Sequence, residues 1–202
     1  CGKATMPFGW THSAGHYPLP AMEEYDPELF ERIRAAVRAG SWQLVGGNWA
    51  ETDQGLCTGE SVVRNYLLGK RYFRERFGVD VKIAWQMEGS AYLATLPQVL
   101  RGFGFRGAVL GWHKFWGEGW RPVFRWRGAD GSELPVVGLK HYFLAWEELP
   151  RWLEEAREID APWPPYRFAA VYGGGDHGGG PDWRFLHALR RQLQGMGVPA
   201  HT

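Results

Sequence analysis

The feature that most constrains the fold is an alternation between short apolar runs and longer segments of helical periodicity. The apolar runs occupy residues 42–45, 81–86, 107–112 and 167–171. Strands separated by helices favour a parallel sheet buried on both faces, either a barrel or a doubly wound sheet. These strands are too few to close a barrel without more chain. In either architecture, ligands bind beyond the carboxyl ends of the strands.

The helical segments carry start and stop signals. Asp26 and Pro27 predict a cap and a first helical position, and that helix ends at Gly40. Thr58 caps a longer helix that ends at Gly78. The apolar positions predicted for the buried face of this longer helix are Val62, Val63, Tyr66, Phe73 and Phe77. Further helices are predicted over 91–101, 146–158 and 182–193.

Residues 123–140 interrupt this alternation. Two β-like runs flank the turn sequence Ala129-Asp130-Gly131-Ser132, which predicts an inserted hairpin. No repeat, low-complexity tract or linker divides the chain, so we expect residues 1–202 to belong to a single domain. Because the sequence begins with Cys1 rather than Met, we expect it to be a fragment of a longer polypeptide.

Charge and cysteine content exclude several classes of protein. The 23 Lys and Arg balance 22 Asp and Glu, so the net charge of +1 argues against a nucleic-acid partner. No run approaches the roughly 18 to 20 apolar residues of a membrane span. The two cysteines, Cys1 and Cys57, cannot build a disulfide framework, which favours a reducing cytoplasm.

Carboxylates follow three of the predicted strands. Parallel strands would bring these loops to one rim, where paired acids beside tryptophans suit glycoside hydrolysis. The alternative is that these acids make only turn and loop contacts. The candidates are Glu51 and Asp53 in the first loop, Glu88 in the second, and Asp176 with His177 in the third.

The chain holds 12 tryptophans, several of them in or beside these loops. Trp49 and Trp116 are candidates for stacking on a sugar ring, and core packing is the alternative role for such residues. Core packing is favoured for Trp85, which falls inside a predicted strand. His12 and His16 have a spacing that would suit a metal on a helix, but Pro18 and its neighbours argue against a helix there.

Several uncommon strings occur in one order across nearly the whole chain. They are Val45-Gly46-Gly47, Trp49-x-Glu51-x-Asp53, Gly59-Glu60-Ser61, Gly69-Lys70-Arg71, Phe77-Gly78-Val79 and Gly175-Asp176-His177-Gly178-Gly179-Gly180-Pro181. Together these strings resemble the family 38 glycoside hydrolases, the retaining α-mannosidases. Residues 42–97 carry most of the resemblance, and it continues through Asp130-Gly131-Ser132.

The resemblance implies a seven-stranded β/α barrel, a zinc ion, and double displacement through a covalent mannosyl intermediate. Glu88 occupies the position of the family's nucleophilic Asp, which also ligates zinc, so Glu88 is the catalytic and metal-binding candidate. Asp176 corresponds to a loop at the active site and is the candidate general acid. Trp49, Glu51, Asp53, His177 and Trp116 are the candidate substrate-binding residues. The family's other zinc-binding motifs, an N-terminal His-x-His-x-Asp and a later His, are absent from this sequence.

Two other functions stay open. One is a catalytically degenerate module that holds sugar without turnover, because Glu88 places its carboxylate one methylene farther out than Asp does. The other is a different hydrolase or a deacetylase on a similar barrel. The expected partners are a mannoside or oligosaccharide substrate and a second copy of the protein, joined through segments outside this chain.

Overall fold

The computed structural model describes residues 10–15, 17–87, 91–111, 123–139 and 183–195. The chain divides into two compact units, residues 1–139 and residues 140–202. Every described strand lies in the first unit, whereas the described part of the second unit is the helix α6 (Trp183–Gly195). This helix confirms the last predicted helix. The predicted helix over 146–158 and the predicted strand over 167–171 lie outside the described residues.

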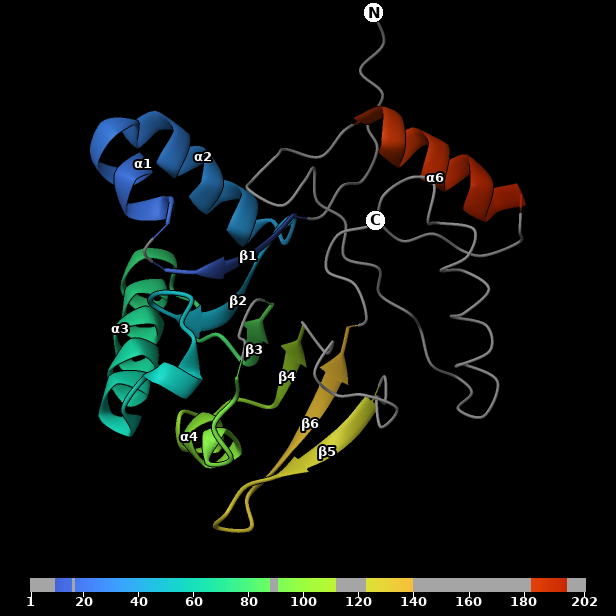
Figure 1. Cartoon of the computed structure of the whole chain (residues 1–202). Helices are drawn as coiled ribbons and strands as arrows, with labels where there is room; N and C mark the ends of the chain where they lie inside the picture. The colour runs from blue at the N-terminus through green and yellow to red at the C-terminus, as the bar shows by residue number, and fades with distance from the viewer. Residues whose placement is uncertain (1–9, 16, 88–90, 112–122, 140–182, 196–202) are drawn as a thin grey trace, which may run out of the picture. The chain divides into compact units, whose positions relative to one another are not determined.

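Parallel strands form the centre of the first unit (Figure 1). Strand β1 (Trp10–Ala14) pairs in parallel with β2 (Trp42–Asn48), and β3 (Ile83–Gln86) pairs in parallel with β4 (Gly107–Leu110). Strand β2 also lies beside β3. The predicted α/β class with parallel sheet segments is therefore confirmed, and the strand β1 is an addition to the prediction.

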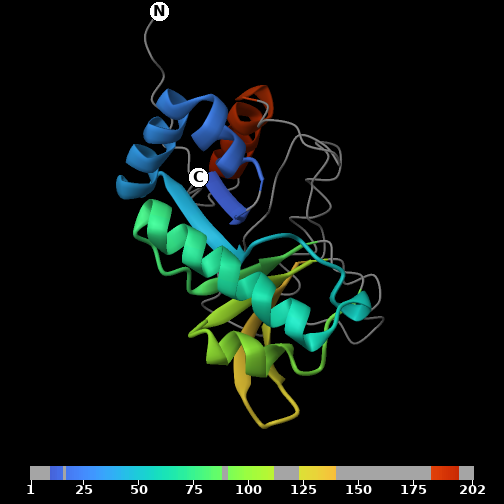
Figure 2. The same cartoon turned by 90° about the vertical axis from the view of Figure 1, so that its left-hand side faces the viewer.

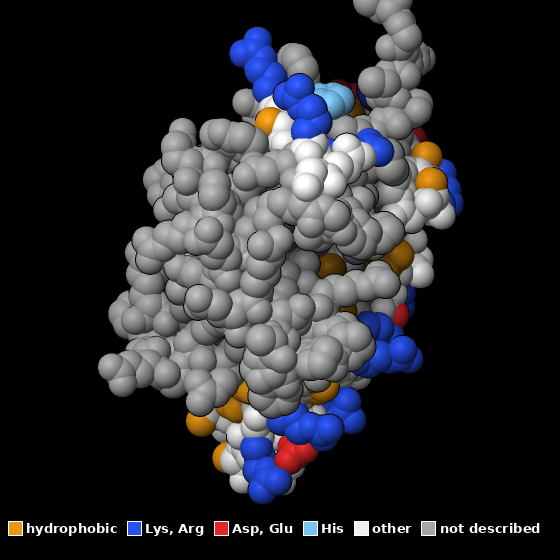
Figure 3. Space-filling view, turned by 90° about the vertical axis from the view of Figure 1, so that its right-hand side faces the viewer, with side chains coloured by type: hydrophobic (Ala, Val, Ile, Leu, Met, Phe, Trp, Pro, Cys, Tyr) orange, Lys and Arg blue, Asp and Glu red, His pale blue; other side chains and the backbone are white. Residues whose placement is uncertain are grey.

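The predicted hairpin is confirmed and extends the sheet. Strands β5 (Val123–Arg127) and β6 (Glu133–Gly138) pair antiparallel, and β6 also pairs in parallel with β4, which gives the order β3-β4-β6-β5. The Asp130 carboxylate accepts a hydrogen bond from the Ser132 backbone N–H at 2.9 Å and so closes the turn. Basic and acidic side chains meet at the hairpin end of the molecule (Figure 3), where Arg127 pairs with Glu133 at 2.8 Å.

Two of the helices begin and end as their signals predict. The Asp26 side chain caps α2 (Pro27–Arg38) by accepting from a backbone N–H of its first turn. Thr58 does the same for α3 (Gly59–Phe77), and Gly78 ends that helix in the left-handed region at φ 69°. The expected position of Val63 on the buried face is wrong, because its side chain is 36% exposed. Successive side chains on an α-helix point about 100° apart. Because Val62 is buried in the core, Val63 points away from it.

The helix predicted over 91–101 begins later, at Leu96, and forms α4 (Leu96–Gly102). Pro97 explains the difference, since a proline inside a helix removes a hydrogen bond and clashes with the carbonyl four residues earlier. The helix therefore starts where Pro97 falls in its first turn. Two short elements were not predicted: the helix α1 (Leu19–Tyr25) and the 3-10 turn η1 (Gln54–Leu56).

Helices cover one face of the strands (Figure 2). The core between them is made of fully buried side chains, including Tyr66 and Phe73 from α3 and Leu100 from α4. Apolar side chains on the strands are half-exposed at Ile83, Val123 and Val137, by 38%, 43% and 39%. Among the described residues, helices therefore cover one face of the strands, and burial of both faces stays a prediction.

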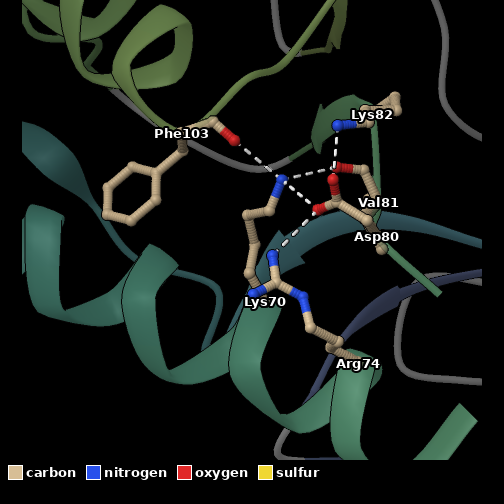
Figure 4. A network of polar contacts seen from close by, with 6 residues as sticks. All are labelled: Lys70, Arg74, Asp80, Val81, Lys82 and Phe103. Atoms are coloured by element: carbon tan, nitrogen blue, oxygen red, sulfur yellow. Dashed lines mark hydrogen bonds and ion pairs between the residues drawn. The ribbon is translucent and has the colours of Figure 1, made fainter. Parts of the chain in front are cut away.

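A buried lysine ties three segments together at the amino-terminal end of β3 (Figure 4). Lys70 of α3 is 5% exposed, and its Nζ donates to the carbonyls of Val81 at 2.9 Å and Phe103 at 2.8 Å. The same nitrogen lies 2.7 Å from Oδ1 of Asp80 and 4.5 Å from the centre of the Phe105 ring. The buried ammonium group of Lys70 therefore finds its hydrogen-bond acceptors inside the fold, which offsets the cost of removing its charge from water.

Helix α3 approaches β2 backbone to backbone at Gly69. A Cβ atom on Gly69 would lie 2.2 Å from the carbonyl carbon of Asn48 and 2.5 Å from the carbonyl oxygens of Asn48 and Gly47. Backbone atoms cannot rotate away as the end of a side chain can. Glycine at this position is therefore required for the close packing of α3 on the end of β2.

We predict that Lys70→Met lowers the free energy of unfolding of the intact protein by about 2 to 4 kcal/mol, because it leaves two carbonyls and a carboxylate without their buried donor. Arg71→Met is the matched control, since Arg71 is 64% exposed and pairs with Glu75 at 3.8 Å. We expect this control to change stability by less than about 0.5 kcal/mol in chemical denaturation. Equal effects of the two substitutions would contradict the assigned role of Lys70.

We predict that Asp80→Asn flattens the pH dependence of stability in the acid range. Hydrogen bonds from Lys70 and Lys82 hold the pKa of Asp80 well below its ordinary value. The resulting stabilisation is present above the unfolded-state pKa of about 3.9 and is lost as the pH falls toward the folded-state pKa. Melting temperatures of the wild type and the variant should therefore differ at pH 7, and the difference should shrink steadily as the pH falls below about 4. A constant difference would count against this coupling.

We predict that Gly69→Ala destabilises the intact protein by about 3 kcal/mol or more, because its Cβ must push α3 off β2. Gly59→Ala on the same helix is the control, since a Cβ there meets nothing within 4 Å. That control should be neutral or stabilising by up to about 1 kcal/mol. Thermal denaturation of both variants measures the difference, and a mild effect at Gly69 would show that α3 can move without cost.

Candidate active site at the carboxyl ends of the strands

The loop that follows β2 is fixed by an asparagine of α3. The Trp49 N–H donates to the Asn65 carbonyl at 2.9 Å. The Asn65 side chain accepts from the Ala50 N–H at 2.8 Å and donates to the Ala50 carbonyl at 2.8 Å. Asn65 thus holds the backbone directly before Glu51. Sequence reasoning missed this residue, although a polar side chain three positions after the buried Val62 was a usable signal.

Two loops that are far apart in the sequence meet at the ends of β2 and β3. The Met87 N–H donates to Oε1 of Glu51 at 3.4 Å, and Nε2 of Gln86 donates to the Thr52 carbonyl at 2.7 Å. The Gln54 side chain donates to Oε1 of Gln86 at 2.8 Å. Both glutamines are buried, with exposures of 1% for Gln54 and 2% for Gln86. Neither glutamine was a sequence-predicted site residue.

Tyr92 connects the same rim to the next strand. Its hydroxyl lies 3.0 Å from the Gly111 carbonyl and 3.3 Å from the Gln86 carbonyl, so one O–H is shared between the ends of β3 and β4. Its ring packs edge-on against Trp126. Burial raises the pKa of Tyr92, and the nearby negative charge of Glu51 raises it further. Tyr92 therefore stays protonated and keeps its role as a donor.

The described candidate residues differ in their surroundings. Glu51 is exposed beyond its contact with Met87, which leaves carboxylate lone pairs for a ligand. The half-buried ring of Trp49 packs edge-on against Tyr72 with centroids 5.4 Å apart, which favours its packing role. Asp53 precedes η1, and its carbonyl accepts from the Leu56 N–H at 3.1 Å.

The other candidates, Glu88, Trp116, Asp176 and His177, lie outside the described residues. The described structure therefore brings Glu51 to the residue directly before Glu88. It assigns no position to the third loop.

The described donor groups do not fit a zinc site by themselves. In the ranges that the structure describes, no three His, Cys, Asp or Glu side chains gather closely enough to hold a metal ion. His12 lies in β1, not on a helix; its Nε2 lies 2.8 Å from the Ala14 carbonyl, and burial lowers its pKa. Glu88, the zinc ligand that the resemblance assigns, lies outside these ranges.

The sequence predicts neither a disulfide framework nor a membrane span. Cys57 carries a free thiol and is partly buried. None of the described helices is long and apolar enough to cross a membrane.

The arrangement at this rim suits the binding of a polar ligand. An exposed carboxylate on a fixed backbone accepts hydrogen bonds from hydroxyl groups, and sites of this kind form where parallel strands end. The buried amides of Gln54 and Gln86 hold the backbone at Thr52, directly after Glu51, through the bond to the Thr52 carbonyl.

Comparison with known proteins confirms the resemblance carried by the motifs. Residues 4–199 match the N-terminal domain of the family 38 glycosyl hydrolases. Alpha-mannosidase G of Dictyostelium discoideum is 30% identical over 199 residues, which cover 95% of this chain and 18% of that protein. Human Alpha-mannosidase 2C1 is 31% identical over 183 residues, covering 86% and 17%. The chain thus spans less than a fifth of the length of these relatives.

Solved structures support the same fold. An alpha-mannosidase from Enterococcus faecalis V583 superimposes with a TM-score of 0.72 at 18% identity, covering 95% of this chain and 23% of that one. The 4-alpha-glucanotransferase from Thermococcus litoralis gives a TM-score of 0.67 at 17% identity, covering 97% and 31%. On the family match over residues 4–199, this chain belongs to glycosyl hydrolase family 38.

Proposed function

We propose that this chain is part of the catalytic domain of an α-mannosidase-like glycoside hydrolase. The observation that carries the proposal is the contact of Glu51 with the Met87 N–H, which joins two loops that carry candidate site residues, in a family 38 chain. Because the chain spans 18% of Alpha-mannosidase G, the activity is proposed for the full-length protein. The substrate class, α-mannosides, follows the names of the relatives.

The proposed reaction retains configuration through two carboxyl groups. In the first step, Asp176 gives its proton to the glycosidic oxygen while the Glu88 carboxylate forms a bond to the anomeric carbon and the leaving alcohol departs. In the second step, Asp176 takes a proton from water, whose oxygen attacks the anomeric carbon and releases Glu88. Trp49, Glu51, Asp53, His177 and Trp116 are the proposed contacts to the sugar.

The proposal places the chain in a seven-stranded β/α barrel, with residues 1–202 in one domain. Glu88 is the one zinc ligand that the proposal assigns to this chain, and neither step of the reaction above depends on the metal. We also infer that the protein is cytoplasmic, because two cysteines give no disulfide framework, and that copies associate through segments outside this chain. Metal analysis of the purified full-length protein tests the zinc assignment, which predicts a bound ion that Glu88→Ala releases.

We predict that the full-length protein hydrolyses an aryl α-mannoside and that Glu88→Gln lowers kcat by at least about 10³-fold, because an amide is a far weaker nucleophile than a carboxylate. A fluorinated mannosyl inactivator should label the wild type at Glu88 and leave Glu88→Gln unlabelled, as read by peptide mass spectrometry. Gln98→Glu provides a control carboxylate on α4 that should not be labelled.

Two outcomes would redirect the proposal. Labelling of Glu88→Gln at wild-type yield would move the nucleophile to another residue. Binding of mannosides by the wild type, with neither hydrolysis nor labelling, would favour the degenerate carbohydrate-binding module instead.

A further inference from the structure

We propose that Gln86 is a positioning residue for the Glu51 carboxylate. The proposal rests on the proposed function and adds to it a residue that none of the motifs contains. Gln86 and Met87 form hydrogen bonds with two neighbouring residues of the loop after β2, Thr52 and Glu51. The Gln86 side chain bonds the Thr52 carbonyl at 2.7 Å, and the Met87 N–H bonds the Glu51 carboxylate at 3.4 Å.

The burial of Gln86 indicates a role beyond filling space. Its side chain is 2% exposed at the end of a strand whose preceding buried residue is Ala84. An apolar side chain would fill such a position without the cost of burying an amide, which is large when the hydrogen bonds of the amide are not made. Gln86 makes both kinds of bond, one as a donor and one as an acceptor.

Gln54 sets the orientation of this amide. Its Nε2 donates to Oε1 of Gln86 at 2.8 Å, so the oxygen of Gln86 faces Gln54. The nitrogen of Gln86 then faces the Thr52 carbonyl, where a donor is needed. Without Gln54, the opposite rotamer of the amide would set an oxygen against the Thr52 carbonyl. The two amides therefore form a chain of hydrogen bonds between the loops, in which each nitrogen donates and the oxygen of Gln86 accepts.

A second set of contacts keeps the loop folded independently of Gln86. Asn65 holds Ala50 from the other side through two bonds of 2.8 Å. Loss of the Gln86 amide should therefore shift Thr52 and Glu51 without unfolding the loop after β2. A displacement of about 1 Å in a group that positions the substrate can cost on the order of 10²-fold in rate. The expected defect is thus in the placement of Glu51, not in the fold.

A double-mutant cycle in the full-length protein tests this role. We expect Gln86→Met to lower kcat/KM for an aryl α-mannoside by at least about 10-fold in the wild type but by less than about 2-fold in Glu51→Ala. Gln86→Glu should resemble Gln86→Met, because a carboxylate cannot donate to the Thr52 carbonyl. Lys70→Met is the control, since it removes a buried polar group at the opposite end of β3 and should leave the kcat/KM of the folded protein unchanged in both backgrounds. Equal losses from Gln86→Met in both backgrounds would overturn the proposal.

Amide hydrogen exchange gives a readout that does not need activity. In Gln86→Met, the amides of residues 51–54 and of Met87 should exchange at least about 10-fold faster, while those of α3 keep the wild-type rate. Unchanged exchange at 51–54 and Met87, or equal acceleration throughout the chain, would contradict positioning by Gln86. If the wild type hydrolyses no mannoside, the proposed function fails, and the exchange rates still decide whether Gln86 fixes Glu51.

Discussion

The side-by-side position of β2 and β3, with their carboxyl ends together, is the constraint on which the rest of the site depends. Parallel strands place all their carboxyl ends at one edge, so the residues after each strand become neighbours whatever their separation in sequence. Glu51 and Met87 are 36 positions apart and meet there because β2 lies beside β3. The packing of β2 beside β3 thus brings the two loops together, and the loop residues supply the chemistry of the site.

Helix α3 makes contacts at both ends of these strands. At one end, Lys70 joins the helix to the start of β3 and to the segment after α4. At the other end, Asn65 fixes the backbone that presents Glu51. Between them, Gly69 lets the helix rest on the backbone of β2. A single helix therefore carries both the contacts that hold the start of β3 and those that hold the loop before Glu51.

The sequence predicted the elements whose signals are local. The caps at Asp26 and Thr58, the stop at Gly78 and the turn at Asp130 each depend on a few neighbouring residues, and each is confirmed. Strand β1 was missed because polar residues such as His12 and Ser13 mask its apolar pattern. The buried pair Gln54 and Gln86 could not be found this way, because the hydrogen bond between the two amides joins residues 32 positions apart in the sequence. The family resemblance came from motif order and was confirmed by the comparisons.

The central claim is that the loops after β2 and β3 form one carbohydrate site. A crystal structure of the full-length protein with a bound mannose-like iminosugar tests this claim most directly. The account predicts that the sugar ring lies at the carboxyl ends of these strands, with Glu51 and Glu88 both within hydrogen-bonding distance of it. An iminosugar bound elsewhere, or the two carboxylates facing opposite sides of the sheet, would contradict the account.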